Sequence, residues 1–584
     1  MRTRIVSTAF ALAALAAALA GCGSSASTGT SADPATAVPS TAPVYVGAVV
    51  RPTGALKTNA LAAGKTLTHQ ADPYSRLLSV LQTPGSPALD FSRDVAPWLG
   101  PNAGLFLTSL GSSEAIVSLL QQGLTGGGDA SSGAQWPFGT GAGGGAQGAI
   151  VLDTSNLAAA QKFVSNAAAH AGAHASSYRG VSYQASGGGD AFAVVDRLVV
   201  LGTVSGVHAV IDTVQGGPSL KSDASYAQLQ SLAPADALGH VYANPAALSA
   251  THGATSSQGL PALLGVLGGT RPLNVSLVPS SSSLALDADV GPPTAPATGA
   301  QSGGLLAAAA AGGRALSELP GESWLAAGLG NVGGAVGGGL DGLHGLLSLA
   351  STLGSSGAGE GVASPQARLS VKGLLEGLLT PLSALSANTA QARRDYLSWM
   401  GEAGVFASGT SVLELRGAVV IDSTNPSASR AAVAKLASAL RQAGEKATPA
   451  TIPGTEAAIE AKITGLPLTL VIADGRAANG QSKFVLGLGQ PSVTDALNPP
   501  STLLTAASYS AAQTALGEGI QPSISVDFAT LLSLLEGVGL GEDPTISRFV
   551  PYLRASTTLS GGGKSLGGGV QRLRLVLGLQ PAAG

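Results

Sequence analysis

The chain has 584 residues, which excludes a single small module because a domain holds roughly 150 residues. Hydrophobic residues make up 45% of the chain and charged residues only 11%, so a large core can form and few charges are available for surface recognition. The 30 Lys and Arg residues nearly balance the 33 Asp and Glu residues. This balance lacks the basic excess of nucleic-acid-binding proteins, and we expect no nucleic-acid partner.

The N-terminus has the pattern of an export signal. Arg2 and Arg4 precede an uncharged apolar stretch over Ile5–Ala20, which is shorter than the roughly 20 residues of a membrane-spanning helix. The following Leu-Ala-Gly-Cys at Leu19–Cys22 resembles the lipobox of bacterial lipoproteins, in which the cysteine carries the acyl chains. Cys22 is the sole cysteine, which excludes an intramolecular disulfide. We therefore expect a lipoprotein signal peptide over residues 1–21 and lipidation, including palmitate, at Cys22.

Residues 22–43 are rich in Ser, Thr, Ala and Pro, which is typical of a flexible tether, and we predict that they are disordered. The folded body should begin near Val44.

The remaining chain contains an internal repeat. Arg93–Gly100 and Arg394–Gly401 share the pattern RDxxxW[LM]G, and Gly148–Asn156 matches Gly417–Asn425. Ser225-Tyr226 recurs further on as Ser508-Tyr509, so the landmarks keep the same order. We predict two homologous modules at residues 44–291 and 320–580, joined by a Pro- and Gly-rich linker over residues 292–319.

Short apolar runs bounded by turn residues predict strands, taken in chain order, at Ala149–Asp153, Phe192–Val195 and Leu198–Leu201. Leu273–Val278 and Leu284–Val290 predict a hairpin. Ala-rich segments predict helices at Leu157–Ala171 and Ser429–Ala443, and leucines and valines at steps of three or four predict another from Leu329. Hairpins with interspersed helices favour an α+β fold, in which each module is a mainly antiparallel sheet with packed helices.

The first module carries a Gly-rich insertion at about residues 111–148 that the second lacks. Trp136 and Phe138 flank a proline within it, and exposed aromatic pairs often mark interaction sites. The insertion is thus a candidate docking loop, although its aromatic side chains can equally pack back on the module.

Several short motifs lack the context that their chemistry needs. Gly328–Gly333 satisfies GxGxxG but has no acidic residue at the end of a second strand, so we interpret it as close helix–sheet packing. Gly562–Ser565 and Gly64–Thr66 lack the first glycine of a phosphate-binding loop, and we interpret them as a hairpin turn and a helix end. His170 and His174 would share one helix face, without a convincing third metal ligand. We expect no cofactor, no metal site and no identifiable catalytic residue.

The RDxxxW[LM]G element is the most interesting candidate, because Arg, Asp and Trp are scarce in this chain. Asp94 and Trp98 in the first copy correspond to Asp395 and Trp399 in the second. The pattern fits a structural element, with the aspartate capping a turn and the tryptophan filling the core, and it also fits a binding element.

Together, the export signal, the acidic-x-x-x-Trp-Leu-Gly element at Asp94–Gly100, the following strand and the Ser225-Tyr226 segment resemble the bacterial domain-of-unknown-function family 3352. The resemblance implies an envelope protein and carries over no catalytic residue. Two interpretations remain: a non-enzymatic lipoprotein, anchored at the extracytoplasmic face of the cell membrane, that binds a lipid or an envelope protein; or a cell-wall or lipid-modifying hydrolase. Low charge and a mean hydropathy of +0.32 favour the first.

Overall fold

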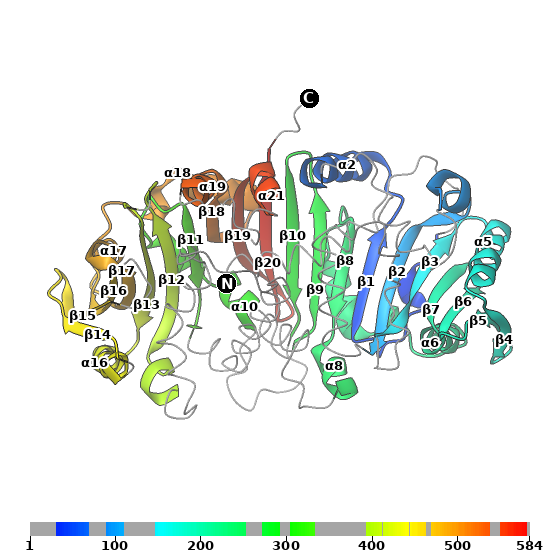
Figure 1. Ribbon diagram of the computed structural model, residues 1–584, viewed down its shortest axis with the longest axis horizontal. Coiled ribbons are helices and arrows are strands. Elements are labelled where there is room, and N and C mark those ends of the chain that lie inside the picture. Colours follow the sequence, from blue (N-terminus) through cyan, green and yellow to red (C-terminus); the bar gives the residue numbers. More distant parts are fainter. Residues whose placement is uncertain are drawn as a thin grey trace, which may run out of the picture.

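The computed structural model describes residues 31–68, 89–109, 146–252, 271–292, 304–332, 393–411, 413–442, 444–462, 469–537 and 549–580. Within them, twenty strands form one antiparallel sheet, seen as a broad strip in Figure 1. The α+β fold with a mainly antiparallel sheet is confirmed.

Ten strands belong to the first half of the chain. They are β1 (Val44–Val49), β2 (Leu99–Ser109), β3 (Gln147–Thr154), β4 (His174–Tyr178), β5 (Val181–Ala185), β6 (Asp190–Val195), β7 (Leu198–Thr203), β8 (Gly239–Ala243), β9 (Leu273–Pro279) and β10 (Ser283–Val290). The three short strands expected from sequence are β3, β6 and β7, and the expected hairpin is β9–β10. These predictions are confirmed.

The second half contributes the other ten. They are β11 (Leu325–Leu329), β12 (Met400–Ser408), β13 (Arg416–Ser423), β14 (Lys446–Pro449), β15 (Thr455–Lys462), β16 (Thr469–Arg476), β17 (Ser482–Leu488), β18 (Gln521–Asp527), β19 (Ser556–Gly567) and β20 (Val570–Leu579).

The strand order across the first half is β4-β5-β6-β7-β3-β2-β1-β8-β9-β10. Across the second half it is β14-β15-β16-β17-β13-β12-β11-β18-β19-β20. Each strand of one half therefore has a counterpart in the same place in the other. The halves meet where β10 pairs with β20, and we call this junction the seam.

Helices cover the sheet, several of them in corresponding places in the two halves. In the first half they are η1 (Pro34–Thr36), α2 (Gly54–Thr68), η2 (Phe91–Val95), α5 (Leu157–His170), α6 (Val204–Val214), η3 (Leu220–Ser222), α7 (Ala224–Leu232) and α8 (Pro245–His252). In the second they are α10 (Gly304–Ala310), α11 (Gly313–Ser317), η5 (Arg393–Leu397), α16 (Pro426–Gln442), α17 (Gly489–Leu497), η6 (Leu503–Thr505), α18 (Ala507–Leu516), α19 (Phe528–Gly537) and α21 (Val550–Ala555). Helices α5 and α16 follow β3 and β13, and α6 and α17 follow β7 and β17. None of the described helices has both the length and the apolar composition needed to cross a membrane.

Alternation along the strands creates a core on each face of the sheet. Val46 of β1 packs in the core that contains α5, while the adjacent Tyr45 packs in the core that contains α6 and α7. Helix α5 begins at Asn156, whose side chain accepts a hydrogen bond from Ala159 N, and it buries residues such as Phe163 and Val164 on one face. The predicted helix over Leu157–Ala171 therefore forms because its cap and its apolar stripe agree.

The boundaries predicted for the tether and the linker are wrong. Residues 31–43, predicted as disordered, contain η1 and place Ala35, Ala37 and Val38 in the core. Within the predicted linker 292–319, residues 304–319 form α10 and α11 and bury Leu316. These segments pack because small side chains fit closely between elements brought together from elsewhere in the chain.

Three local predictions also change. Leu329 ends strand β11, and the part of the helix predicted beyond residue 332 lies outside the described residues. Residues 562–565 lie within strand β19 rather than in a hairpin turn. His170 ends α5 whereas His174 begins the edge strand β4, so they do not share a helix face. Gly172, at φ 62°, provides the left-handed turn between them.

Candidate functional site

The repeated RDxxxW[LM]G element forms the same structure in both halves. The Trp98 Nε1 donates to Asp94 O at 2.9 Å, and the Trp399 Nε1 donates to Asp395 O at 3.0 Å. Both indole rings are fully buried, and the Trp98 ring lies 4.8 Å from that of Phe163. Each tryptophan thus closes its own turn and fills the core beneath α5 or α16.

The carboxylates of the element lie at the surface of these turns. Asp94 accepts from Asp90 N at 2.9 Å and pairs with Arg93 at 2.8 Å. The hydrogen bond from Arg93 and that from Asp90 N lower the pKa of Asp94 to about 2. Asp395 instead pairs with Lys435 of α16 at 2.7 Å. The two aspartates therefore hold their turns by different cations.

The tryptophan carbonyls connect this element to the second repeated motif. Trp98 O accepts from Ser155 N and from Thr154 Oγ1, at 2.8 and 2.7 Å. Trp399 O accepts from the backbone N and the Oγ1 of Thr424, at 2.9 and 3.0 Å. The two motifs of the repeat are thus two parts of one hydrogen-bonded joint at the end of β3 or β13.

An aspartate at each joint holds the segment that enters the half. In the first half, Asp153 is buried and accepts from Ser31 Oγ at 2.9 Å and from Ala32 N at 3.2 Å. Asn102 donates to Ser31 Oγ at 2.7 Å and completes this contact. In the second half the equivalent Asp422 accepts from Arg314 Nη2 at 2.7 Å, and Arg314 lies in α11.

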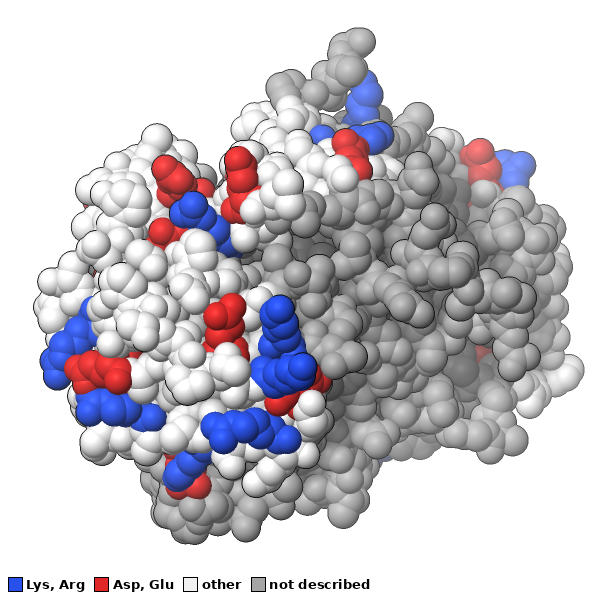
Figure 2. Space-filling view, turned by 60° about the vertical axis from the view of Figure 1, so that its left-hand side comes forward, with Lys and Arg blue, Asp and Glu red and all other residues white. Residues whose placement is uncertain are grey.

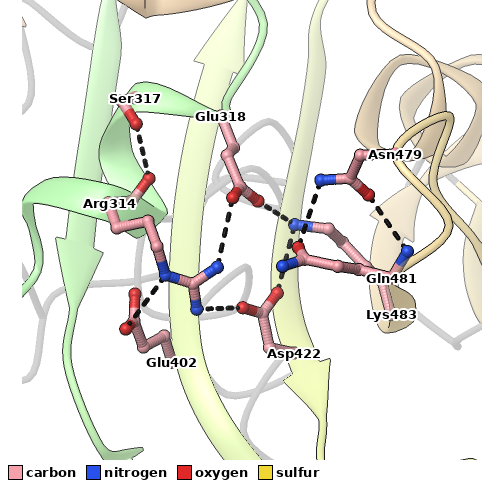
Figure 3. Close-up of polar contacts among 8 residues, drawn as sticks. All are labelled: Arg314, Ser317, Glu318, Glu402, Asp422, Asn479, Gln481 and Lys483. Atoms are coloured by element: carbon pink, nitrogen blue, oxygen red, sulfur yellow. Dashed lines mark hydrogen bonds and ion pairs between the residues drawn. The ribbon is translucent and has the colours of Figure 1, made fainter.

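Asp422 and four other charged side chains form a cluster, which Figure 3 shows with its polar neighbours. Arg314 also contacts Glu402 and Glu318, each at 3.2 Å. The buried Lys483 of β17 binds Glu318 and lies 3.1 Å from Asp422. The three carboxylates share two cations, so the cluster fastens α11 to strands β12, β13 and β17.

Buried polar groups of the second half replace apolar residues of the first. Lys483 pairs with Asp422 in the ladder where Leu198 pairs with Asp153. Ser429 of α16 donates to Asp474 Oδ2 at 2.5 Å, and burial raises the pKa of Asp474. Because Ser429 is fully buried, it serves as the partner of this carboxylate and is not accessible to a substrate.

The seam holds a group of four charges, of which Asp287 and Asp289 have no exposed surface, Arg572 is buried and the Arg574 side chain is 27% exposed. Arg572 binds Asp289 through Nε and Nη2, both at 2.7 Å, and Arg574 binds Asp287 through Nε and Nη2 at 2.6 and 2.7 Å. Arg572 also approaches Asp287 at 3.2 Å. The hydrogen bonds to Asp287 raise the pKa of Arg574.

The two seam arginines also bind the ends of equivalent helices. Arg572 Nη2 donates to Leu232 O at the end of α7, at 2.7 Å, and Arg574 Nη1 donates to Leu516 O at the end of α18, at 3.4 Å. A cation at a helix C-terminus is favourable because the helix dipole is negative there. The seam charges thus tie the sheet of one half to the helices of both.

Sequence reasoning did not identify the seam charges. Their signal is visible in the chain as Asp-x-Asp at 287–289 and Arg-x-Arg at 572–574, each with the period of a strand. Four charges inside apolar strands are unusual where charged residues make up 11% of the chain.

The other predicted sites stand as follows. Cys22, Trp136 and Phe138 lie outside the described residues. Asp94 and Asp395 lie in separate halves and form two separate turns, as do Trp98 and Trp399. Among the described residues, no group of three or more His, Cys, Asp or Glu side chains is placed to hold a metal ion. Figure 2 shows the second half with its surface charges in mixed groups of both signs.

Fold and polar sites together define a large α+β protein whose charged clusters join sheet, helices and halves. The chain belongs to the family described as protein of unknown function (DUF3352), whose model matches residues 5–529. No curated protein matches the chain. A solved structure, crystal form I of TP0453, is similar over 46% of this chain and 82% of its own, at 9% identity and a TM-score of 0.23.

Proposed function

We propose that this chain is a lipid-anchored protein at the extracytoplasmic face of the cell membrane, with a non-enzymatic binding or envelope-structural role. The observation that carries the proposal is the position of Cys22, the sole cysteine, directly after the apolar stretch and only nine residues before Ser31. Ser31 is already hydrogen-bonded to Asp153, so only the short segment of residues 23–30, which we call the leash, joins the acylated residue to the packed body.

The contacts of the charged clusters support a structural role for them. Arg314 and Lys483 fasten α11 to the sheet, and Arg572 and Arg574 close the seam. Each cation is hydrogen-bonded to acidic groups of its own cluster. A rigid platform with two cores is well suited to present a surface to a lipid or an envelope protein.

The two halves, in this proposal, arose by duplication. Support comes from the identical strand orders, from the indole hydrogen bonds of Trp98 and Trp399, and from the aspartates Asp153 and Asp422 at the two joints. Asn156 and Asn425 each accept a backbone N–H three residues on, at 3.1 and 3.2 Å.

The anchor is tested by expressing the full chain in a host that processes lipoproteins, with labelled palmitate. The unaltered chain should incorporate label and sediment with membranes, and Cys22→Ala should do neither. Ser25→Ala, which leaves the four-residue signal intact, is the matched control and should behave as the unaltered chain. Label and membrane association retained in Cys22→Ala would overturn the proposal.

The non-enzymatic role is tested on protein lacking residues 1–22. Mass spectrometry of organic extracts should find a stoichiometric lipid if the platform binds an apolar ligand, and pull-down from envelope fractions should find a protein if it does not. Turnover of a cell-wall or ester substrate by the empty protein would instead establish a hydrolase.

A further inference from the structure

We propose that one end of the sheet lies directly against the phospholipid bilayer. This end, which we call the anchor end, is the one at which β1 and β3 finish, at Val49 and Thr154. The inference rests on the proposed acylation of Cys22 and adds to it an orientation and a contact surface.

The leash fixes where the anchor leaves the body. Eight residues lie between Cys22 and Ser31, and at full extension the nine steps from one to the other span at most about 30 Å. Ser31 is held by Asp153 and Asn102, and Asn102 pairs in the ladder with Val49, the last residue of β1. Since the chain leaves the packed body at this end, we place the entry of the acyl chains into the bilayer on this side of the sheet.

The strand pairings show that the anchor end continues across the seam along the same edge of the sheet in the second half. The antiparallel pairings place the start of β10, the end of β20, the start of β19 and the end of β18 in one row, at Ser283, Gly578, Thr558 and Asp527. The next pairings add the start of β11 and the end of β12. Figure 1 shows α2, α19 and α21 along this edge, at the top of the view.

Exposed apolar side chains gather at the same end. The large hydrophobic residues exposed in the described chain are Leu61 (39%), Leu157 (43%), Leu413 (99%) and Leu504 (58%). Leu61 lies in α2, which follows β1, and Leu157 begins α5, which follows β3. Leu413 lies in the β12–β13 connection, where β12 reaches the anchor end.

Leu504 completes the set. It lies in η6, where Leu503 N donates to Leu319 O and Thr502 bridges to Pro320, on the segment that leads into the start of β11. All four of these exposed leucines, two from each half, thus lie along the edge of the sheet at which Ser31 is held. Scattered exposed leucines are ordinary, whereas leucines gathered at the end that carries a lipid anchor are suited to dip into the bilayer interface.

The occupant is a bilayer rather than a protein because the anchor brings one within reach of this end. Lys57 and Lys65 of α2 add positive charge beside Leu61, which favours contact with lipid phosphates. Acyl chains and a patch of apolar and basic contacts then act as two membrane-binding signals in one molecule.

The test uses the acylated full-length protein in phosphatidylcholine vesicles that contain nitroxide-headgroup lipid. With the Cys22 thiol acylated, Leu413→Cys and Ser565→Cys each provide a single thiol for a fluorescent label. Ser565 is exposed near the far end of β19, about 30 Å from Ser556 at the anchor end, so it is the matched control. Leu61→Cys is a second anchor-end position in the other half.

The label at Leu413 should lose more than half of its fluorescence on vesicles with quencher, relative to vesicles without it, and the label at Leu61 should also be quenched. The label at Ser565 should change little. Quenching at Ser565 alone, or at none of the three while the protein floats with vesicles, would overturn the orientation. Failure of the protein to carry acyl chains or to float would instead count against the lipid anchor itself.

Discussion

Replacing Arg572 with Met should destabilise the whole protein, because it removes the guanidinium that neutralises a carboxylate inside the seam. Arg572 gives Asp289 two hydrogen bonds of 2.7 Å, gives Leu232 O a third, and lies 3.2 Å from Asp287. Asp289 has no exposed surface, so water cannot take the place of the lost donors. Removing one partner of such a buried pair costs about 3–5 kcal/mol of unfolding free energy.

The double variant Arg572→Met/Asp289→Leu separates the charge from the packing. Because neither charge then remains buried without its partner, this variant should recover most of the loss, as apolar replacements of buried ion pairs often do. Arg554→Met is the matched control. It breaks the ion pair with Glu536, whose side chains are 64% and 47% exposed, and should cost less than about 1 kcal/mol.

Urea unfolding of the full chain, followed by tryptophan fluorescence, measures these differences. The buried Trp98 and Trp399 report on the first and second halves. If Arg572→Met were no less stable than Arg554→Met, or if the double variant were less stable than the single one, the seam charges would not hold the halves together as described.

Three further predictions concern other sites. Burial lowers the pKa of His240 from 6.5 to about 4, so between these pH values the unfolded chain binds a proton that the folded chain does not. The unfolding free energy should therefore fall by about 2–3 kcal/mol as the pH drops from 6.5 to 4, and urea titrations of His240→Gln at a series of pH values should lack this fall. Lys483→Met should cost about 2–3 kcal/mol in the same assay, because Asp422 and Glu318 lose a buried cation, whereas Lys221→Met, whose ion pair is exposed, should change little; equal effects would contradict the role of the cluster. Gly563→Val should lower the unfolding free energy by about 1–3 kcal/mol, since a Cβ there would collide with the Ala310 Cα of α10. Ser565→Val, at an exposed position of the same strand, should be tolerated, and thermal unfolding distinguishes the two variants.

The elements predicted correctly from sequence are those determined by neighbouring residues. The hairpin formed by Leu273–Pro279 and Ser283–Val290 has two apolar runs and a Ser-rich turn, and helix α5 has its cap and its stripe within one segment. Such local patterns need no knowledge of the remaining chain. The α+β class followed from them.

The packed N-terminal segment could not be predicted in this way. Residues 31–43 have no apolar periodicity, yet Val38 O accepts from Leu220 N and Ala35 lies in the core of the first half. Small residues in a Pro- and Ser-rich segment resemble a tether in composition. Only the distant surface against which they pack distinguishes the two.

The candidate site was predicted in part. The spacing of Asp94 and Trp98 is compatible with the turn in the structure, in which the indole bonds back to a carbonyl four residues earlier and Asp90 caps the first residues. The link from this turn to Thr154 and Asp153 joins residues more than 50 positions apart. The strand-period charges at the seam were visible, but their pairing across nearly 300 residues depends on how two halves meet.

The charges at the seam also explain why unlike halves pair. Asp287 pairs with Arg574 across the seam, and the two residues occupy corresponding positions in the two halves. The row of paired residues that contains Asp287 passes through Gly47 and Gly104. The row that contains Arg574 passes, apart from a bulge at Pro522–Ile524, through Gly328 and Gly404. Two first halves meeting in this register would bury Asp287 against Asp287, and two second halves would bury Arg574 against Arg574. Like charges in a dry interface are strongly unfavourable, so the ladder closes only between one half and the other. Strands β10 and β20, which as free edges could pair with further copies of the chain, are thereby paired with each other within one chain.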